Sequence, residues 1–367
     1  MDGSAEAFSI YNASFNFLVF LSLILSSSFI HRIEKTYVMY AWSIFSSIGT
    51  VFIALAPTNL FKLAIYLLSA VAFGMGLLAF SAYFWSLTVP QERGRIAGLV
   101  GFVFLPVFPL AVTLANNLDF FGTIMLCILL NLGPLAIKPL DPKKITMLAG
   151  KKNRREYDAG IRTVLLYLIP WVIFSLINTT LAKAVSSHIS QYLSPSPLMM
   201  LWILQVAGGG LGAIMSGIIA DLFGRRPSLA FGFTCYGISS AISGVAESYE
   251  MLCIAFLGCG LTWGALTTLY LFVIWGDLAT SETCVRRYAV GLAIFYAAMG
   301  IGTIFTPQLL QIPLMTASIF SCLLIFLSYI PFILAPEVLP SDLREKIRLN
   351  LYIHLIKKKE KKIRNQK

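Results

Sequence analysis

Apolar runs recur along almost the whole chain, and they leave few folds open to it. A bilayer core about 30 Å thick is crossed by roughly 20 apolar helical residues. Of the 367 residues, 57% are hydrophobic and only 12% are charged, and the mean hydropathy is +0.79. The runs are continuous and lack the alternation of membrane strands. The sequence therefore predicts an all-α integral membrane protein whose transmembrane helices lie at residues 9–30, 37–56, 62–87, 96–116, 119–137, 161–182, 198–220, 227–246, 250–276, 288–309 and 313–335.

The loops between these eleven predicted spans carry charge on one side of the membrane. Of the 28 Lys and Arg residues, all but Lys62 and Lys183 fall in alternate loops and the C-terminal tail. Cytoplasmic loops are enriched in Lys and Arg, so the N-terminus is expected outside and the C-terminus in the cytoplasm of a multi-pass plasma-membrane protein. The tail from residue 337 is basic and amphipathic, which indicates contact with anionic inner-leaflet lipid. The net charge of +11 is thereby explained, and nucleic acid is not expected as a partner.

The two halves of the chain align weakly when the sequence is shifted by 190 residues. The shift lays the stretch at 56–76 over the stretch at 246–266 and matches Gly74 to Gly264. Repeats of this kind mark secondary transporters. We therefore expect two pseudo-repeated bundles, with an N-terminal bundle at 1–137, a cytoplasmic linker at 138–160, a C-terminal bundle at 161–336 and a basic tail at 337–367.

Two stretches on the basic side resemble signature loops of one transporter family. They are GIIADLFGRR at residues 217–226 and VPQERGRIAGL at residues 89–99. Both resemble the major facilitator superfamily (MFS), and the likeness extends over residues 9–335. The resemblance implies two helical bundles that expose a central cavity to each side of the membrane in turn. By register, the run at 9–30 corresponds to the second helix of the family, so the usual first helix is expected to lack a counterpart here.

The charges in these loops predict a gate on the cytoplasmic side. A partly desolvated network of opposite charges is worth more than the about 0–1 kcal/mol of an exposed pair, and it can break in a second conformation. We expect Asp221 to pair with Arg225 and Arg286. The alternative interpretation is that Arg225 and Arg226 only anchor the loop on the positive side. The candidate gate residues are Gly217, Asp221, Gly224, Arg225, Arg226, Asp277, Glu282, Arg286, Arg93 and Arg95.

The candidate solute path follows from the register with the family, which places the spans at 62–87, 161–182 and 250–276 around the cavity. Their polar and aromatic residues, with two from flanking spans, are Ser69, Ser81, Tyr83, Trp85, Tyr167, Trp171, Asn178, Gln205, Thr262, Trp263, Thr267, Thr268, Tyr270 and Tyr296. Each is individually more typical of helix packing than of ligand contact. No ionisable residue lies near the middle of any predicted span, which favours a neutral or weakly polar solute. A coupling proton would need a carboxylate nearer the rim, and Asp277 is the candidate.

Glycines and cysteines complete the prediction. The run AGGGLGAIMSG at residues 207–217 predicts close helix packing. The six cysteines form no CxxC pair, and no cofactor, metal site or catalytic cluster is expected, so an enzyme is the remotest class.

The sequence favours a transporter that works by alternating access, as a uniporter or symporter permease. The alternatives are a transport-dead relative that acts as a receptor or partner subunit, and a drug efflux carrier.

Overall fold

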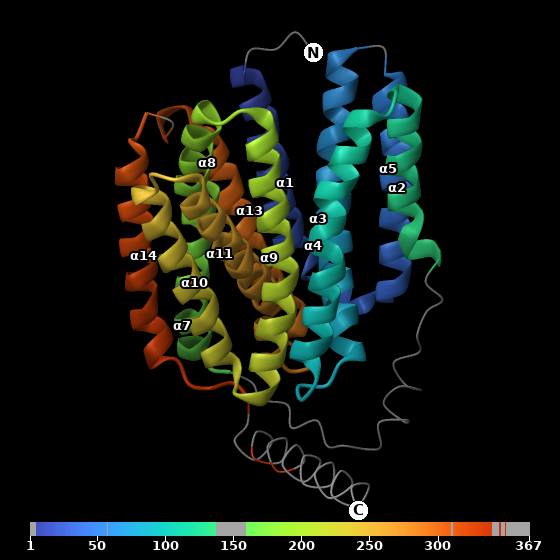
Figure 1. Cartoon of the computed structure of the whole chain (residues 1–367). Coiled ribbons are helices and arrows are strands. Elements are labelled where there is room, and N and C mark those ends of the chain that lie inside the picture. The colour runs from blue at the N-terminus through green and yellow to red at the C-terminus, as the bar shows by residue number, and fades with distance from the viewer. Residues whose placement is uncertain are drawn as a thin grey trace, which may run out of the picture.

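The chain folds into long helices that run side by side (Figure 1). The computed structural model describes residues 5–56, 58–136, 159–309 and 311–339, together with 345 and 349. The first half contains α1 (Ala5–Ser26), the 3-10 turn η1 (Ile30–Arg32), α2 (Lys35–Leu55), α3 (Asn59–Leu87), α4 (Arg93–Asn117) and α5 (Phe120–Ala136). The second half contains α7 (Ile161–Thr179), α8 (Leu181–Tyr192), α9 (Pro195–Leu222), α10 (Arg225–Val245), α11 (Tyr249–Thr268), η2 (Leu269–Val273), α12 (Ile274–Asp277), α13 (Cys284–Leu309) and α14 (Leu314–Leu334).

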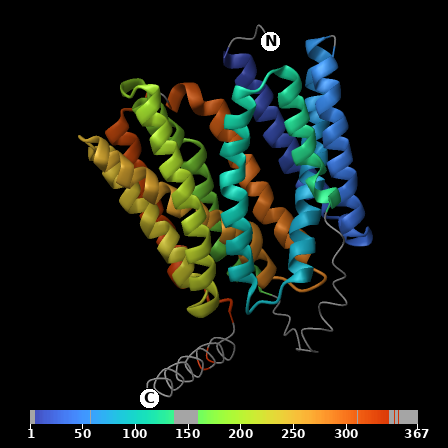
Figure 2. The ribbon, with the colours of Figure 1, turned by 45° about the vertical axis from the view of Figure 1, so that its right-hand side comes forward.

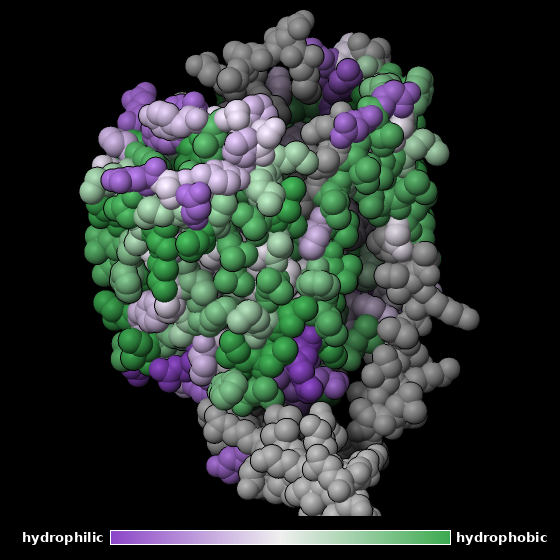
Figure 3. All heavy atoms as spheres, in the orientation of Figure 1, coloured by the Kyte–Doolittle hydropathy of each residue, from purple (hydrophilic) through white to green (hydrophobic). Residues whose placement is uncertain are grey.

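The helices have the length and surface of a membrane protein. Nine spans among the described residues are long and apolar enough to cross a bilayer, with α7 and α8 forming one of them and α11 to α12 another. On the face shown in Figure 3, hydrophobic side chains cover the middle of the molecule and hydrophilic side chains gather toward its two ends. The prediction of an all-α membrane protein is confirmed.

The predicted spans and the observed helices agree within a few residues, with two local differences. The run at 161–182 predicts one helix, whereas the structure ends α7 at Thr179 and begins the separate helix α8 at Leu181. The run at 250–276 predicts a regular helix, whereas residues 269–273 form a π-helical segment. A π-helix changes the direction of every residue after it, and this one sets the direction of Asp277 at the end of α12.

The repeat is visible in where the helices begin. The helices α9, α10 and α11 each begin 190 residues after α1, α2 and α3. The helices α3 and α11 also begin with the same cap, because Thr58 Oγ1 accepts from the Phe61 N–H at 3.3 Å and Ser248 Oγ accepts from the Met251 N–H at 3.3 Å. Two pseudo-repeated sets of helices are thereby confirmed. The pair α7 and α8 precedes α9 and has no counterpart among the described residues before α1.

The first half of the chain contacts the second mainly through two helix pairs. They are α1 with α13 and α4 with α9, and Figure 2 shows α13 running between α1 and the remaining helices of the second half. Glycine makes the packing around α9 close. A Cβ on Gly217 would collide with the Gly94 carbonyl oxygen of α4, and a Cβ on Gly212 would collide with the Leu261 carbonyl oxygen of α11. The predicted close packing of the glycine run is confirmed.

Two predicted segments lie wholly or largely outside the described residues. The expected linker at 138–160 is described only at residues 159 and 160. The expected basic tail at 337–367 is described only at 337–339, 345 and 349. The interaction of the tail with lipid therefore stays a prediction.

Candidate functional site

A buried network of charges lies where α4, α9, α10 and α12 meet at one end of the molecule. Arg225 and Asp221 have no exposed surface, and Asp277 is 8% exposed. Arg225 donates from Nη1 to Asp221 Oδ1 at 3.0 Å and from Nε to Asp277 Oδ2 at 2.6 Å. It also donates to the carbonyl oxygens of Ala220 and Pro90, each at 2.6 Å. One guanidinium thus connects both carboxylates, the end of α9 and the loop before α4.

The first half of the chain enters the same network through the start of α4. Asp221 accepts from the backbone N–H groups of Gly94 and Arg95, each at 2.9 Å. A carboxylate at a helix N-terminus satisfies orphan N–H groups and the positive end of the helix dipole. The Arg93 side chain, buried at 2% exposure, pairs with Asp277, and its Nε donates to Thr88 Oγ1 at 3.1 Å. The two buried arginines and two buried aspartates balance in charge, so the network can exist away from water.

Glu337, just after α14, binds the first backbone N–H groups of α10. Its carboxylate accepts from the backbone N–H of Arg225 at 2.8 Å and of Arg226 at 3.1 Å. Gly224 precedes them with a φ of 115°, a value that side chains disfavour. A Cβ on Gly224 would also come within 2.5 Å of the Glu337 carboxylate. The predictions omitted Glu337, although an acid directly after the last apolar span and on the side of Arg225 was a usable signal.

Two of the predicted gate residues lie at the surface instead of in the network. The residues Glu282 and Arg286 are exposed. The expected pairing of Asp221 with Arg286 is therefore corrected, because Arg95 and Arg225 occupy the two carboxylate oxygens. Arg95 reaches Asp221 Oδ2 from the rim at 3.2 Å, with 52% of its side chain exposed. Arg226 lies outside the buried core of the network, with its guanidinium 6.0 Å from the ring centroid of Phe332.

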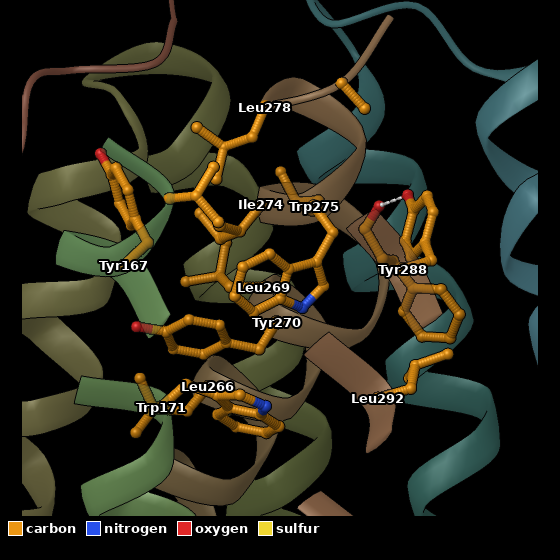
Figure 4. Close-up of a cluster of buried hydrophobic side chains, with 14 of the residues drawn as sticks. Tyr167, Trp171, Leu266, Leu269, Tyr270, Ile274, Trp275, Leu278, Tyr288 and Leu292 are labelled. Atoms are coloured by element: carbon orange, nitrogen blue, oxygen red, sulfur yellow. Dashed lines mark hydrogen bonds between the residues drawn. The ribbon is translucent and has the colours of Figure 1, made fainter. Parts of the chain in front are cut away.

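Several predicted path residues form a packed aromatic core next to the network (Figure 4). The Trp171 ring stacks on Tyr270 with 4.4 Å between centroids, and both side chains have no exposed surface. Trp171 Nε1 donates to the Gly291 carbonyl at 2.7 Å, and Tyr167 Oη donates to the Pro336 carbonyl at 2.7 Å. These side chains pack helices together in this conformation, and a role in the solute path stays a prediction for them.

Five further predicted path residues also have identifiable neighbours. Thr262 donates to the Gly232 carbonyl at 3.2 Å, and Thr267 bonds to the carbonyl of Trp263. Trp85 Nε1 donates to the Gly276 carbonyl at 2.8 Å. Tyr83 packs on a small cluster in the first half, and Tyr296 meets Phe73 edge to face at 5.8 Å. Contacts within and between helices thus involve all five side chains.

Three predicted path residues line a cavity of about 50 Å³ within the second half of the chain, namely Asn178, Gln205 and Trp263. They come from α7, α9 and α11. Trp263 Nε1 donates to Asn178 Oδ1 at 2.7 Å, which fixes the two side chains relative to each other. Serines of α10 and α14 also line the cavity. The predicted residues thus fall in three places: the polar cavity, the ionic network and the aromatic core near the network.

Part of the sequence is similar to known transporters. Residues 157–275 match the family model described as "Sugar (and other) transporter". A stretch of 64 residues is 44% identical to a lincomycin resistance protein of Streptomyces lincolnensis. That alignment covers 17% of this chain and 13% of the relative, so it extends over far less than two thirds of that protein.

Solved structures match nearly the whole fold. The human organic anion transporter MFSD10 (TETRAN) superposes with a TM-score of 0.69 at 14% identity, over 89% of this chain and 83% of that chain. The MFS proton:xylose symporter XylE, bound to 6-bromo-6-deoxy-D-glucose, superposes with a TM-score of 0.65 at 12% identity, over 90% of this chain and 86% of that chain. At identities this low, the superpositions show the fold alone. That fold is the one that the two loop motifs resemble, so the resemblance is confirmed.

Proposed function

Because the chain has the fold of the major facilitator superfamily transporters, we propose that it moves a small neutral or weakly polar solute across the membrane by alternating access. In this proposal the two bundles, at 1–137 and 161–336, rock about a central path. The network around Asp221 closes one end of that path. Fold and family point to a transporter and away from an enzyme.

The observation that carries the proposal is the burial of the network between the two halves. Asp221 and Arg225 belong to the second half, and they bind the start of α4 in the first half through Gly94, Arg95 and Pro90. Buried ion pairs contribute little to net stability, yet breaking one by removing a partner costs about 3–5 kcal/mol. Such a junction suits a contact that forms in one state and opens as a unit in another.

The chemistry of the chain favours a neutral solute. The buried charges cluster at one end of the helices, and those of the network are paired with each other. Both oxygens of Asp277 are occupied by Arg93 and Arg225. If a proton is coupled to transport, Asp277 is the candidate to accept it, and only after the network has opened.

The same proposal includes the orientation of the protein and the membrane in which it lies. The network lies on the side where Lys and Arg residues gather, so we infer that it faces the cytoplasm of a plasma-membrane protein. The N-terminus is then outside, and the basic C-terminal tail lies at the inner leaflet near anionic lipid.

Drug efflux is a second candidate, and the match to a lincomycin resistance protein favours it. A receptor or partner subunit without transport is the third candidate. These candidates make different predictions for flux in a purified system.

Uptake of three radiolabelled probes into proteoliposomes separates the candidates. The probes are xylose, lincomycin and an organic anion such as benzoate, each measured with wild-type protein and with empty liposomes as the control. The proposal expects flux of the neutral probe. Flux of lincomycin alone would favour efflux, and the absence of flux for every probe from well-folded protein would favour the receptor role.

A further inference from the structure

The cavity beside Asn178 is carried by one half of the chain alone. Its walls come from α7, α8, α9, α10, α11 and α14, and no described residue of α1 to α5 lines it. The helices α10 and α14 contribute Ser240, Ser243 and Ser321. A path between the two bundles does not account for a polar cavity in this place, because these serines sit inside the second bundle.

The polar groups of the cavity offer both donors and acceptors. Asn178 Oδ1 is held by Trp263 Nε1, so the amide can still present two N–H donors. Ser243 donates its hydroxyl hydrogen to the Ser239 carbonyl at 2.9 Å, and Ser321 donates to the Ala317 carbonyl at 2.8 Å. Each serine oxygen keeps lone pairs that can accept. The walls therefore fit a group that donates on one side and accepts on the other.

The charge of the lining residues and the volume of the cavity restrict which groups can bind there. The twelve lining residues, all of them described, include no Asp, Glu, Lys, Arg or His. An ion placed here would lose its hydration without gaining an oppositely charged partner, which disfavours charged groups. A water needs about 10–15 Å³ of such space, so a cavity of about 50 Å³ has room for more than one water. It can therefore hold a small polar group of a solute.

We propose that this cavity is a recognition subsite for the uncharged terminal group of a solute, a group such as a hydroxyl or a carboxamide that both donates and accepts. The inference rests on the proposed transport function, and it assigns selectivity for neutral groups to the second half of the chain. Asn178 and Gln205 make the polar contacts from α7 and α9. Trp263 is a positioning residue that holds the Asn178 amide.

The cavity and the network lie toward opposite ends of the second half. The helix α10 begins with Arg225 in the network and reaches Ser240 and Ser243 near its other end. The helix α14 carries Ser321 in its first half, and its end is tied to Arg226 through the Ile333 carbonyl at 2.7 Å. When the network is closed, a solute would enter the subsite from the opposite side of the membrane.

Cys259 provides a native reporter, because it lines the same cavity. The experiment uses full-length protein in detergent, with the other five cysteines replaced by alanine, and follows the reaction of Cys259 with N-ethylmaleimide. The probes are xylose, acetamide and acetate, the last two being nearly equal in size and different in charge. We expect xylose and acetamide to slow the reaction in a saturable manner and acetate to leave it unchanged.

Two pairs of variants test the geometry. Gln205→Leu should raise the half-protecting concentration about tenfold, the usual effect of losing one hydrogen bond, while Gln311→Leu at an exposed position should not. We expect xylose to raise the melting temperature of the wild-type protein. Ser240→Leu should fill the cavity and abolish that rise, while Ala241→Leu, exposed next to it, should keep it. Should Ser240→Leu fail to fold, the Gln205→Leu measurement still decides.

Three results would overturn the subsite: equal protection by acetate and acetamide, an unchanged half-protecting concentration in Gln205→Leu, or no protection by either neutral probe. Flux in liposomes is an independent readout. Protection without flux would refute the transport proposal and keep the subsite, whereas flux without protection would do the reverse.

Discussion

Asp221 and Arg225 form a buried ion pair, and together they make most of the polar contacts of the network. The Asp221 carboxylate accepts four hydrogen bonds, from two backbone N–H groups of α4 and from the side chains of Arg95 and Arg225. Charge-assisted hydrogen bonds are stronger than neutral ones, and a buried site screens them little. The contact between the two halves therefore depends on these two side chains more than on the exposed charges around them.

Asp221→Asn should shift the protein away from the closed network without unfolding it. The amide keeps the shape of the side chain but loses the charge that Arg225 faces. A coupling of about 1–3 kcal/mol would change the ratio of the two states by about 5- to 150-fold. Uptake should fall, and a cysteine placed beneath the network should react faster from the cytoplasmic side. Glu282→Gln, which removes the same charge from an exposed position, is the control. Normal uptake in Asp221→Asn would contradict the gate and favour the anchor interpretation.

Arg225→Lys should be nearly as harmful as Arg225→Ala. The guanidinium contacts Asp221, Asp277 and two carbonyl oxygens from different directions, and an ammonium cannot reproduce that fork. We expect uptake to fall at least tenfold. Arg286→Lys, at an exposed position, should leave uptake near the wild-type rate, and a tolerated Arg225→Lys would mean that charge alone suffices.

At this scale the sequence predicted the types of residue better than their pairing. Asp221, Arg225, Asp277, Arg93 and Arg95 were all expected at the gate, because loop charge fixes which side each lies on. The partner of Asp221 was misassigned to Arg286, since the topology places several arginines at one depth without saying which way each points. The missed Glu337 lies 112 positions from Arg225 in the sequence, so its place after the last apolar span puts it on the side of Arg225 without identifying its partner.

The helices themselves were predictable, because hydropathy reports the length of an apolar run directly. The break between α7 and α8 and the π-helical segment Leu269–Val273 were not. Both leave the composition of the run unchanged, and both arise from local backbone hydrogen bonding that tertiary packing selects. The π segment matters most, because it sets the direction of Asp277, which ends the following turn.

Gly212→Ala should weaken the packing of α9 on α11. The added Cβ would meet the Leu261 carbonyl oxygen, a backbone atom that cannot move aside alone. Overpacking of this kind costs about 1–3 kcal/mol, so the melting temperature of the purified protein should fall. Gly133→Ala is the control because a Cβ there has no neighbour within 4 Å. Equal melting temperatures for the two variants would show that the close approach of α9 and α11 is not needed.

The whole molecule has a polarity that topology predicts. The loop at Glu247 joins α10 to α11 at the end away from the network, and the loop at Glu282 follows α12 at the network end. Both residues are exposed. In intact cells an impermeant thiol reagent should label Glu247→Cys and spare Glu282→Cys until the membrane is opened. The reverse pattern would invert the proposed orientation.

The central claim is that the network holds the two halves together at one end in one of two states. The direct test is a spin-label distance between Glu92→Cys, at the start of α4, and Glu282→Cys, after α12, in liposomes and with the six native cysteines replaced. Both residues are exposed, and they belong to different halves. The wild-type network should give a predominant short distance, and Asp221→Asn should add a longer one of comparable or greater population. A single distance distribution that is the same with and without Asp221 would contradict the account.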